Sequence, residues 1–442
     1  MADAMVQDGE RALSLSEAHL RGMAAAAELD LRVDCTTVLD GDPAVWTATL
    51  WRGDGPVPSG LGLGKGNSAA AQVGAVFEAL EHHLSGLRGI TNGGTTLRTA
   101  GEISRDAALR HDVALGLLGD LPDGPMGCLP FRAVSSGAEV DVPLFLSVPD
   151  YLDEEADPLR ESLGDQYDYT SVSRYSCNNG WAAGTDPVEA AVHALNETIE
   201  RDALSLLLID QFLGRRRSPL VLIEASTLPD DLAALVSAAE AILGQRLYLI
   251  DMTSGLGVPA ILAYLPAPDG EPARIRGCGA SLSRHYAIAR AVSELVQVHL
   301  ASTLGNIHSA FTAMTPVRHD WTKPYPALHA CYLGDFSTRL DDATLVAYRD
   351  TEAPDTVAGH YNALIDVLTR RGLTPLRRDH YVTGNLAVVN IFVPGLERFM
   401  LVTDGQVVVP GERGMAVKNN GIRPGSWAEP RLSGSNYFDL KK

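Results

Sequence analysis

Apolar and polar residues recur along the chain with two periods, and these predict helices and strands in alternation. Residues 13–29 are predicted as a helix, and residues 31–38 follow as a strand. Further strands are expected at 128–133, 139–148, 246–250, 259–264 and 386–393, with helical stretches between them. Helices interleaved with strands over the whole length predict a mixed α/β fold without a clean linker.

Three segments interrupt this pattern. Residues 53–60 and 119–125 are rich in glycine and proline and are predicted as turns. Residues 150–168 carry eight carboxylates and one arginine, which favours a solvated loop, with a mobile flap over a site as the alternative.

Three other segments are built alike: a glycine with small polar residues, then about a dozen residues, then a pair of acidic or amide side chains. The glycine stretches are 64–68, 182–187 and 277–281. The pairs that follow them are Glu78 and Glu81, Glu197 and Glu200, and Glu294 and Gln297. Because the spacing between copies is unequal, the chain is not a solenoid. The pattern predicts one local turn–helix unit used three times around a common centre.

The second of these helices has the clearest signals. Asp186 can cap it, Pro187 suits its first position, and Glu189 completes a capping box. Its apolar residues form one stripe, whereas His193, Glu197 and Glu200 fall on another face, since residues three or four apart are neighbours on a helix. Each Glu-x-x-Glu pair therefore presents two carboxylates side by side.

Carboxylates held this close repel each other, and burial adds a desolvation cost, unless cations are present. Hard divalent ions such as Mg²⁺ prefer oxygen ligands and are often bound together with substrate phosphates. The alternative is that the pairs lie on solvated helix faces, but three copies at matching offsets favour the metal interpretation. Gly74 precedes Glu78 by one turn at a cost of about 1 kcal/mol relative to alanine. Either a ligand or a closely packed neighbour would explain it.

Composition excludes several other classes of protein. The net charge is −19, and the longest basic run is residues 215–217, so nucleic acid is not an expected partner. No apolar run approaches the roughly 18 residues of a membrane span, and the start lacks the features of a secretory signal. The five cysteines are far apart and form no Cys-x-x-Cys pair, which predicts free thiols in a cytoplasmic protein.

Common nucleotide and hydrolase motifs do not fit. Lys65 is not followed by Ser or Thr, and Gly60, Gly62, Gly64 and Gly66 alternate, which matches neither a P-loop nor a dinucleotide fingerprint. A glycine-rich turn entering a helix could still offer backbone N–H groups to phosphate. The chain has neither a Gly-x-Ser-x-Gly nor a His-Glu-x-x-His motif.

These same residues resemble the YcaO family. The resemblance rests on 64–66 with 78–81, on 179–184 leading to 197–203, on 290–297, and on the late 393–397. The matching stretches run in family order from about residue 60 to residue 400. The resemblance implies a single large domain over 56–410, with the three turn–helix units around an ATP–Mg²⁺ site, an N-terminal extension (1–55) and a C-terminal tail (411–442).

The implied activity is ATP-dependent modification of backbone amides in a ribosomally made precursor peptide. In that family ATP phosphorylates the amide oxygen after a nucleophile has added to the carbonyl, and loss of phosphate follows. A Cys, Ser or Thr side chain then gives an azoline by cyclodehydration, which is the expected reaction here. Sulfide would give a thioamide and an amine would give an amidine. A partner-dependent subunit with a degenerate ATP site is a further alternative.

The resemblance also assigns roles to residues, without naming a catalytic group. Glu78, Glu81, Glu197 and Glu200 would hold Mg²⁺ and the phosphates, Lys65 and Arg201 would contact phosphate oxygens, and Asn179, Glu294 and Gln297 would line the nucleotide or metal site. His82 and His299 stand where the family usually has arginine, so both are predicted to face the nucleotide as weaker substitutes.

Partners are expected as well. The N-terminal extension looks too short for the usual leader-binding module, so the resemblance implies a separate leader-binding partner (ThiF-like or ocin-type), a flavin dehydrogenase in azole pathways, and a homodimer. The family's proline-rich tail is not matched by residues 435–442, which are expected to be dispensable for catalysis. The opposing hypothesis is that Asp439 or the terminal carboxylate replaces the missing group.

Overall fold

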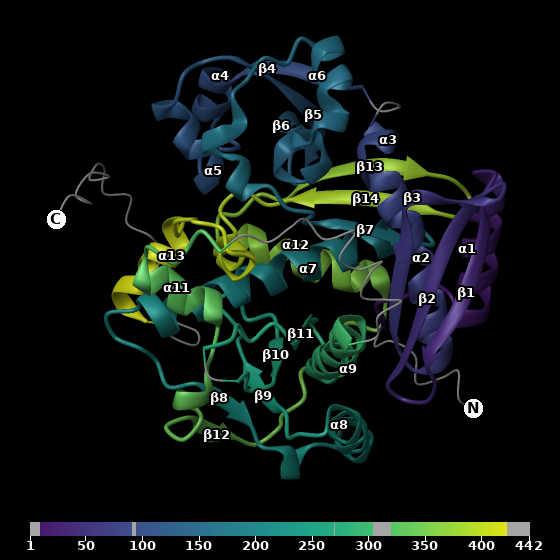
Figure 1. Ribbon diagram of the computed structural model, residues 1–442, viewed down its shortest axis with the longest axis vertical. Coiled ribbons are helices and arrows are strands. Elements are labelled where there is room, and N and C mark those ends of the chain that lie inside the picture. The colour runs from purple at the N-terminus through teal and green to yellow at the C-terminus, as the bar shows by residue number, and fades with distance from the viewer. Residues whose placement is uncertain (1–8, 91–93, 269, 304–319, 422–442) are drawn as a thin grey trace.

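The computed structural model describes residues 9–90, 94–268, 270–303 and 320–421, and within them the chain forms three β-sheets with helices packed against them (Figure 1). The expected tail residues 435–442 lie outside this described part. No helix in these ranges is both long and apolar enough to cross a membrane. All five cysteines are free; Cys128, Cys278 and Cys331 are buried, whereas Cys35 and Cys177 are half-buried.

The first sheet is an antiparallel meander of three strands: β1 (Arg32–Leu39), β2 (Ala44–Arg52) and β3 (Gly55–Gly66). The prediction of a turn over 53–60 is therefore wrong beyond residue 54, because β3 begins at Gly55. The prolines and glycines that suggested a turn lie in an edge strand, which pairs on one side only and tolerates a residue without an N–H group.

The second sheet is antiparallel and central in Figure 1. Its strands in spatial order are β4 (Thr96–Thr99), β5 (Pro125–Ala133), β13 (Leu376–Val382), β14 (Ala387–Phe392) and β7 (Trp181–Gly184), and β6 (Glu139–Pro143) pairs with β5. The strands predicted at 128–133 and 386–393 are thus confirmed. The strand predicted over 139–148 ends at Pro143, after which a short 3-10 turn buries Leu144–Leu146.

The third sheet has five strands in the order β11 (Arg276–Ala280), β10 (Ala260–Tyr264), β9 (Tyr248–Asp251), β8 (Val221–Ile223) and β12 (Thr344–Val346). Its pairs are antiparallel except for β8 and β12, which run parallel. The predicted strands at 246–250 and 259–264 correspond to β9 and β10.

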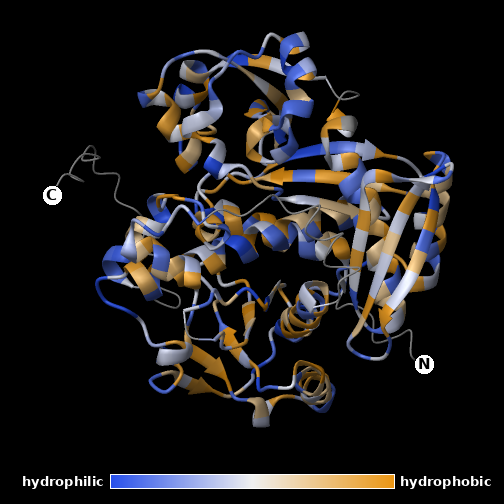
Figure 2. Cartoon of the chain, viewed as in Figure 1, coloured by the Kyte–Doolittle hydropathy of each residue, from blue (hydrophilic) through white to orange (hydrophobic). Residues whose placement is uncertain are grey.

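The α-helices vary from single turns to six turns. They are α1 (Leu15–Glu28), α2 (Ser68–Ser85), α3 (Leu87–Ile90), α4 (Ala100–Arg105), α5 (Val113–Leu117), α6 (Asp157–Leu163), α7 (Pro187–Leu208), α8 (Asp230–Leu243), α9 (Arg284–Thr303), α11 (Pro326–Leu333), α12 (Val357–Arg370) and α13 (Glu412–Asn420). The predicted helix at 13–29 is α1, which begins after Ser14 with a capping box to Glu17. Apolar and polar residues share the surfaces of the longer helices (Figure 2), as expected for helices packed on one side.

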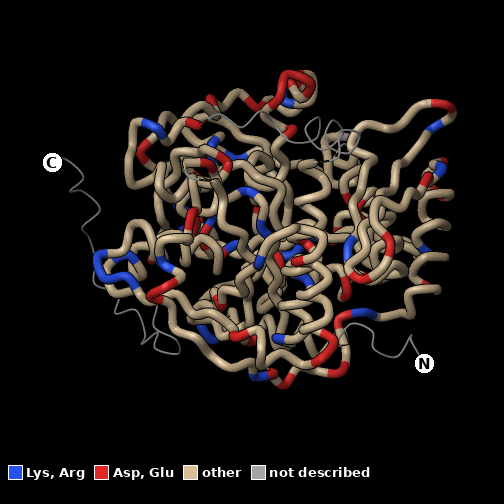
Figure 3. The backbone as a smooth tube through the Cα atoms, turned by 60° about the horizontal axis from the view of Figure 1, so that its bottom comes forward, with Lys and Arg blue, Asp and Glu red and all other residues tan. Residues whose placement is uncertain are grey.

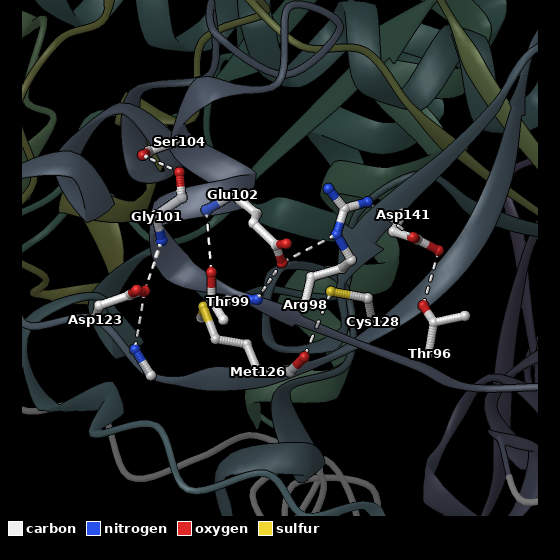
Figure 4. A network of polar contacts seen from close by, with 11 residues as sticks. Thr96, Arg98, Thr99, Gly101, Glu102, Ser104, Asp123, Met126, Cys128 and Asp141 are labelled. Carbon is white, nitrogen blue, oxygen red and sulfur yellow. Dashed lines mark hydrogen bonds and ion pairs between the residues drawn. The ribbon is translucent and has the colours of Figure 1, made fainter.

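Local side-chain bonds fix where the short elements begin. Figure 4 shows this for β4 and α4: Thr99 caps α4, and the Glu102 carboxylate accepts from the Thr99 N–H at 3.0 Å. Arg98 reaches from β4 to Asp141 of the neighbouring chain segment at 3.1 Å. These contacts join β4 to α4 and to β6 in the upper part of Figure 1.

The acidic segment 150–168 is more ordered than the solvated loop predicted for it. It contains short 3-10 turns and α6, which begins at Asp157. Asp165 is buried and accepts hydrogen bonds from the hydroxyls of Tyr151 and Tyr169 at 2.6 and 2.7 Å. The two tyrosine hydroxyls replace the water molecules that the carboxylate loses on burial. The number of charged residues in the segment does not predict this.

The three sheets share one arrangement. β3, β7 and β11 each form one edge of their own sheet, and each leads directly into a long helix: α2, α7 and α9 respectively. Each helix packs back on its own strand. The three similar turn–helix segments of the sequence are therefore three strand–helix units, one from each sheet.

The glycines of these units allow the strand and its helix to approach closely. A Cβ atom on Gly64 would lie 1.7 Å from the carbonyl oxygen of Ala71 in α2, and one on Gly279 would lie 2.2 Å from that of Ala287 in α9. Both positions therefore require the absence of a side chain. Gly62 and Gly64 lie within β3 and pack on α2, so they belong to this strand–helix contact and not to a turn.

We predict that Gly64→Ala lowers the free energy of unfolding by at least 1–3 kcal/mol, since the added methyl group overlaps helix backbone that cannot rotate away. Chemical denaturation measures this change. Gly55→Ala is the matched control, because a Cβ there meets nothing within 4 Å. Equal stability of the two variants would show that β3 and α2 are not packed as described.

Candidate functional site

The three strand–helix units surround one cavity of approximately 1290 Å³. Each helix contributes three side-chain positions at i, i+4 and i+7, and all nine positions line the cavity: Gly74, Glu78 and Glu81 of α2; His193, Glu197 and Glu200 of α7; Arg290, Glu294 and Gln297 of α9. The predicted glutamates and Gln297 therefore converge, although Glu78 and Gln297 are 219 positions apart in the sequence.

Lys65 and Arg201 also line this cavity. Lys65, near the end of β3, forms an ion pair with Glu294 of α9 and so joins the first unit to the third. Arg201 lies 3.4 Å from the Glu197 carboxylate. Asn179 is not among the lining residues; its side-chain oxygen lies behind Arg201 and accepts a hydrogen bond from the guanidinium at 3.2 Å. Asn179 is thus placed to orient Arg201.

Backbone groups of the units hold several of the glutamates. Glu81 of α2 accepts from the N–H of Ala183 in β7 at 3.2 Å, and Glu197 accepts from that of Gly180 at 2.8 Å. Glu294 accepts from the N–H of Cys278 in β11 at 3.2 Å. In the other direction, the Gln297 amide donates to the carbonyl oxygen of Leu63 in β3. Edge strands offer unpaired backbone groups, and here site side chains use them.

Burial and the closeness of the carboxylates in this cavity change their pKa values. Burial, and then the charges of Glu197 and Glu78, raise the pKa of Glu81 well above its usual value. Burial and the neighbouring Glu294 raise the pKa of Glu200 to about 7. The pKa of Glu294 is lowered in spite of burial, because the Lys65 ammonium stabilises its anion. Glu81 and Glu200 are thus the carboxylates that most lack a positive partner.

Arg11, His193 and Arg290 also line the cavity, and the sequence motifs gave none of them a site role. Arg11 precedes α1 and forms an ion pair with Glu189 in the first turn of α7 at 3.3 Å. Arg290 donates to the imidazole of His193 at 3.1 Å. His193 and Arg290 could have been found from their spacing four residues before Glu197 and Glu294, whereas nothing in the sequence places Arg11 beside them.

Outside the cavity, acidic and basic residues are interspersed over much of the chain (Figure 3).

The two histidines predicted to face the nucleotide differ in position. His82 lines the cavity; one ring nitrogen bonds to the carbonyl of Leu61 at 2.8 Å and the other lies 3.9 Å from Glu78. His299 lies on α9 beyond Gln297 and is not a lining residue. The structure thus brings His82 but not His299 to the cavity, because two residues after Gln297 the helix has turned the side chain toward another face.

The donor set fits Mg²⁺. Four carboxylates, Glu78, Glu81, Glu197 and Glu200, face one cavity, and such oxygen ligands are those that Mg²⁺ prefers. Burial raises the pKa of Glu78, Glu81 and Glu200, and a cation bound beside them would stabilise their anions. Among the described residues no three His, Cys, Asp or Glu side chains are close enough together to ligate a single ion. Without a bound cation, carboxylates repel each other, so each is expected to bind a separate backbone N–H group or basic side chain.

Comparison with known proteins places this geometry in a family. Residues 63–397 match the family model described as "YcaO cyclodehydratase, ATP-ad Mg2+-binding". The match includes all three strand–helix units, and the chain belongs to the YcaO family. ATP and Mg²⁺ are the cofactors of this family.

Two curated relatives match about half of the chain. An "Uncharacterized protein in tfuA 3'region" of Rhizobium leguminosarum bv. trifolii is 26% identical over 55% of this chain and 56% of its own length. An "Uncharacterized protein" of Methanothermobacter thermautotrophicus is 30% identical over 51% of this chain and 56% of its own length. The chain thus spans about half the length of the curated relatives it matches.

Solved structures share the fold. The structure of YcaO from Methanopyrus kandleri, bound with AMPPCP and Mg²⁺, has a TM-score of 0.62 at 18% identity, covering 91% of this chain and 97% of that one. A heterocyclase in complex with substrate and cofactor has a TM-score of 0.60 at 16% identity, covering 89% of this chain and 54% of that one. The E. coli microcin synthetase McbBCD complex has a TM-score of 0.51 at 13% identity, covering 83% and 88%.

We predict that Mg²⁺ binds this cavity more tightly at pH 8 than at pH 6. A carboxyl with a pKa of about 7 is mostly protonated at pH 6 and must lose its proton before it can ligate the ion. Titration calorimetry at several pH values measures the effect. In Glu200→Gln the rise across this pH window should shrink, and an unchanged rise would mean that Glu200 is not the titrating ligand.

Proposed function

We propose that this protein is an ATP- and Mg²⁺-dependent enzyme that activates a backbone amide of a ribosomally made precursor peptide and forms azolines by cyclodehydration. The observation that carries the proposal is the convergence of all four paired glutamates, with Lys65 and Arg201, on one cavity. A degenerate ATP site would not retain these groups. The family match supports the cofactors, and the structural likeness supports the fold.

The acidic and basic groups of the cavity suit this chemistry. The amide oxygen is a poor leaving group until it carries a phosphoryl group, and charge develops on the phosphates as that group is transferred. Glu78, Glu81, Glu197 and Glu200 would hold Mg²⁺, which bridges and neutralises the phosphates. Lys65 and Arg201 would bind phosphate oxygens directly, as fixed positive charges inside a partly enclosed cavity.

The nucleophile decides the product. Attack by a Cys, Ser or Thr side chain of the peptide gives an azoline with net loss of water, sulfide gives a thioamide, and an amine gives an amidine. The same phosphorylation serves all three, so mass spectrometry of the product assigns the reaction. We favour the azoline because a heterocyclase and a microcin synthetase share the fold.

Partners belong to the proposal too. A separate leader-binding protein, ThiF-like or ocin-type, would deliver the precursor peptide, and a flavin dehydrogenase could oxidise azolines to azoles. The McbBCD complex, which shares the fold, is an assembly of several proteins. Association of two copies of this chain is a further part of the proposal, and light scattering of the purified protein tests it.

We predict that Glu78→Gln and Glu200→Gln each remove Mg²⁺-dependent ATP binding while the protein stays folded, since each replaces a charged ligand with a neutral side chain of equal size. Calorimetry with Mg-ATP and a thermal melt measure the two properties. Glu154→Gln is the control, because Glu154 is exposed and does not line the cavity. Unchanged Mg-ATP affinity in both site variants would refute the proposed site.

A separate prediction concerns His82. Replacing it with arginine should tighten Mg-ATP binding several-fold, because a permanent guanidinium pairs with phosphate more strongly than a partly neutral imidazole. His299→Arg is the control, since His299 lies outside the cavity lining. If His299→Arg tightened binding and His82→Arg did not, the placement of the two histidines would be wrong.

A further inference from the structure

One layer of the cavity wall contains no carboxylate. It consists of Gly74, His193 and Arg290, which occupy the same position in the three units, four residues before Glu78, Glu197 and Glu294. At 1.5 Å rise per residue, this layer lies roughly 6 Å along each helix from the first carboxylate. On the three helices, the carboxylate positions are therefore preceded by a layer of different chemistry: a glycine, an imidazole and a guanidinium.

The contact between His193 and Arg290 fixes the state of the imidazole. A guanidinium nitrogen of Arg290 lies 3.1 Å from Nδ1 of His193. Arginine can only donate hydrogen bonds, so Nδ1 must accept, and the neutral ring then carries its proton on Nε2. Burial, followed by the charges of Arg290, Arg11 and Lys65, lowers the pKa of His193 well below its ordinary value, which keeps the ring neutral.

The Nε2–H group is available to a ligand. His193 lines the cavity, is only partly buried, and has no hydrogen bond from Nε2 to any described residue. Gly74 leaves room in the same layer, since a Cβ added there would meet only the Cα of Gly64 at 3.5 Å. Close packing on β3 therefore does not require a glycine at position 74.

We propose that His193 is a neutral hydrogen-bond donor of fixed tautomer, whose Nε2–H binds a phosphoryl oxygen seated in the layer of Gly74, His193 and Arg290. An anion one helical turn from the carboxylates can bridge to cations held by them, while His193 and Arg290 supply donors without adding negative charge. The identity of the ligand as a phosphoryl group rests on the proposed function, but the tautomer does not.

Nitrogen NMR of the ¹⁵N-histidine-labelled protein tests the tautomer, with His193→Gln assigning the signal among the 12 histidines. The expected ring is neutral at pH 7 with its proton on Nε2. A proton on Nδ1, or an imidazolium, overturns the proposal. Addition of Mg-AMPPCP or of inorganic phosphate should shift the Nε2–H resonance, and a resonance that neither probe moves also overturns it.

Binding measurements test the ligand. His193→Ala should weaken Mg-AMPPCP binding about 10- to 100-fold, the usual effect of losing a hydrogen bond to a charged group. Adenosine, which has no phosphate, should bind the variant and the parent alike. His193→Gln, whose amide can donate near the position of Nε2, should recover most of the affinity. Equal Mg-AMPPCP affinity in His193→Ala, or an equal loss for adenosine, overturns the role.

The two proposals can fail separately. If the parent protein does not bind Mg-AMPPCP, the ATP-dependent function is refuted, while inorganic phosphate still tests the donor through the Nε2–H resonance. If Mg-AMPPCP binds and His193→Ala binds it equally well, the proposed function stands and the role of His193 is refuted.

Discussion

Repulsion among carboxylates is the constraint on which this site depends. Glu78, Glu81, Glu197 and Glu200 face one cavity, and burial together with neighbouring charge raises the pKa of Glu81 and Glu200. Unpaired charges in such a place are costly. The chain offsets that cost in part with Lys65, Arg201 and backbone N–H groups of the strands, and a bound divalent cation would offset the rest.

The three sheets make this arrangement possible. Each sheet contributes one edge strand and the helix that follows it, so no single sheet has to carry the whole site. Glycines such as Gly64 and Gly279 allow each helix to lie against its strand. The strand–helix contacts that stabilise the fold therefore also position the site residues.

Much of this could be predicted from the sequence. The spacing of Glu78 and Glu81 and its two later copies predicted a common centre, because helical periodicity is local and survives in any fold. Other features were not predictable locally. The prolines of β3 suggested a turn until its place at a sheet edge was known, and Asp165 looked solvated until two tyrosine hydroxyls were found beside it. Arg11 reaches the cavity only through tertiary packing.

The most direct test of the account is the position of the metal. Crystals grown with AMPPCP and Mn²⁺, a Mg²⁺ substitute with a measurable anomalous signal, locate the ions independently of any assumption about the reaction. The account predicts anomalous peaks within bonding distance of carboxylate oxygens of Glu78, Glu81, Glu197 and Glu200, with the phosphates between the ions and the layer of His193 and Arg290. Ions bound elsewhere, or nucleotide bound without ions at these glutamates, would contradict it.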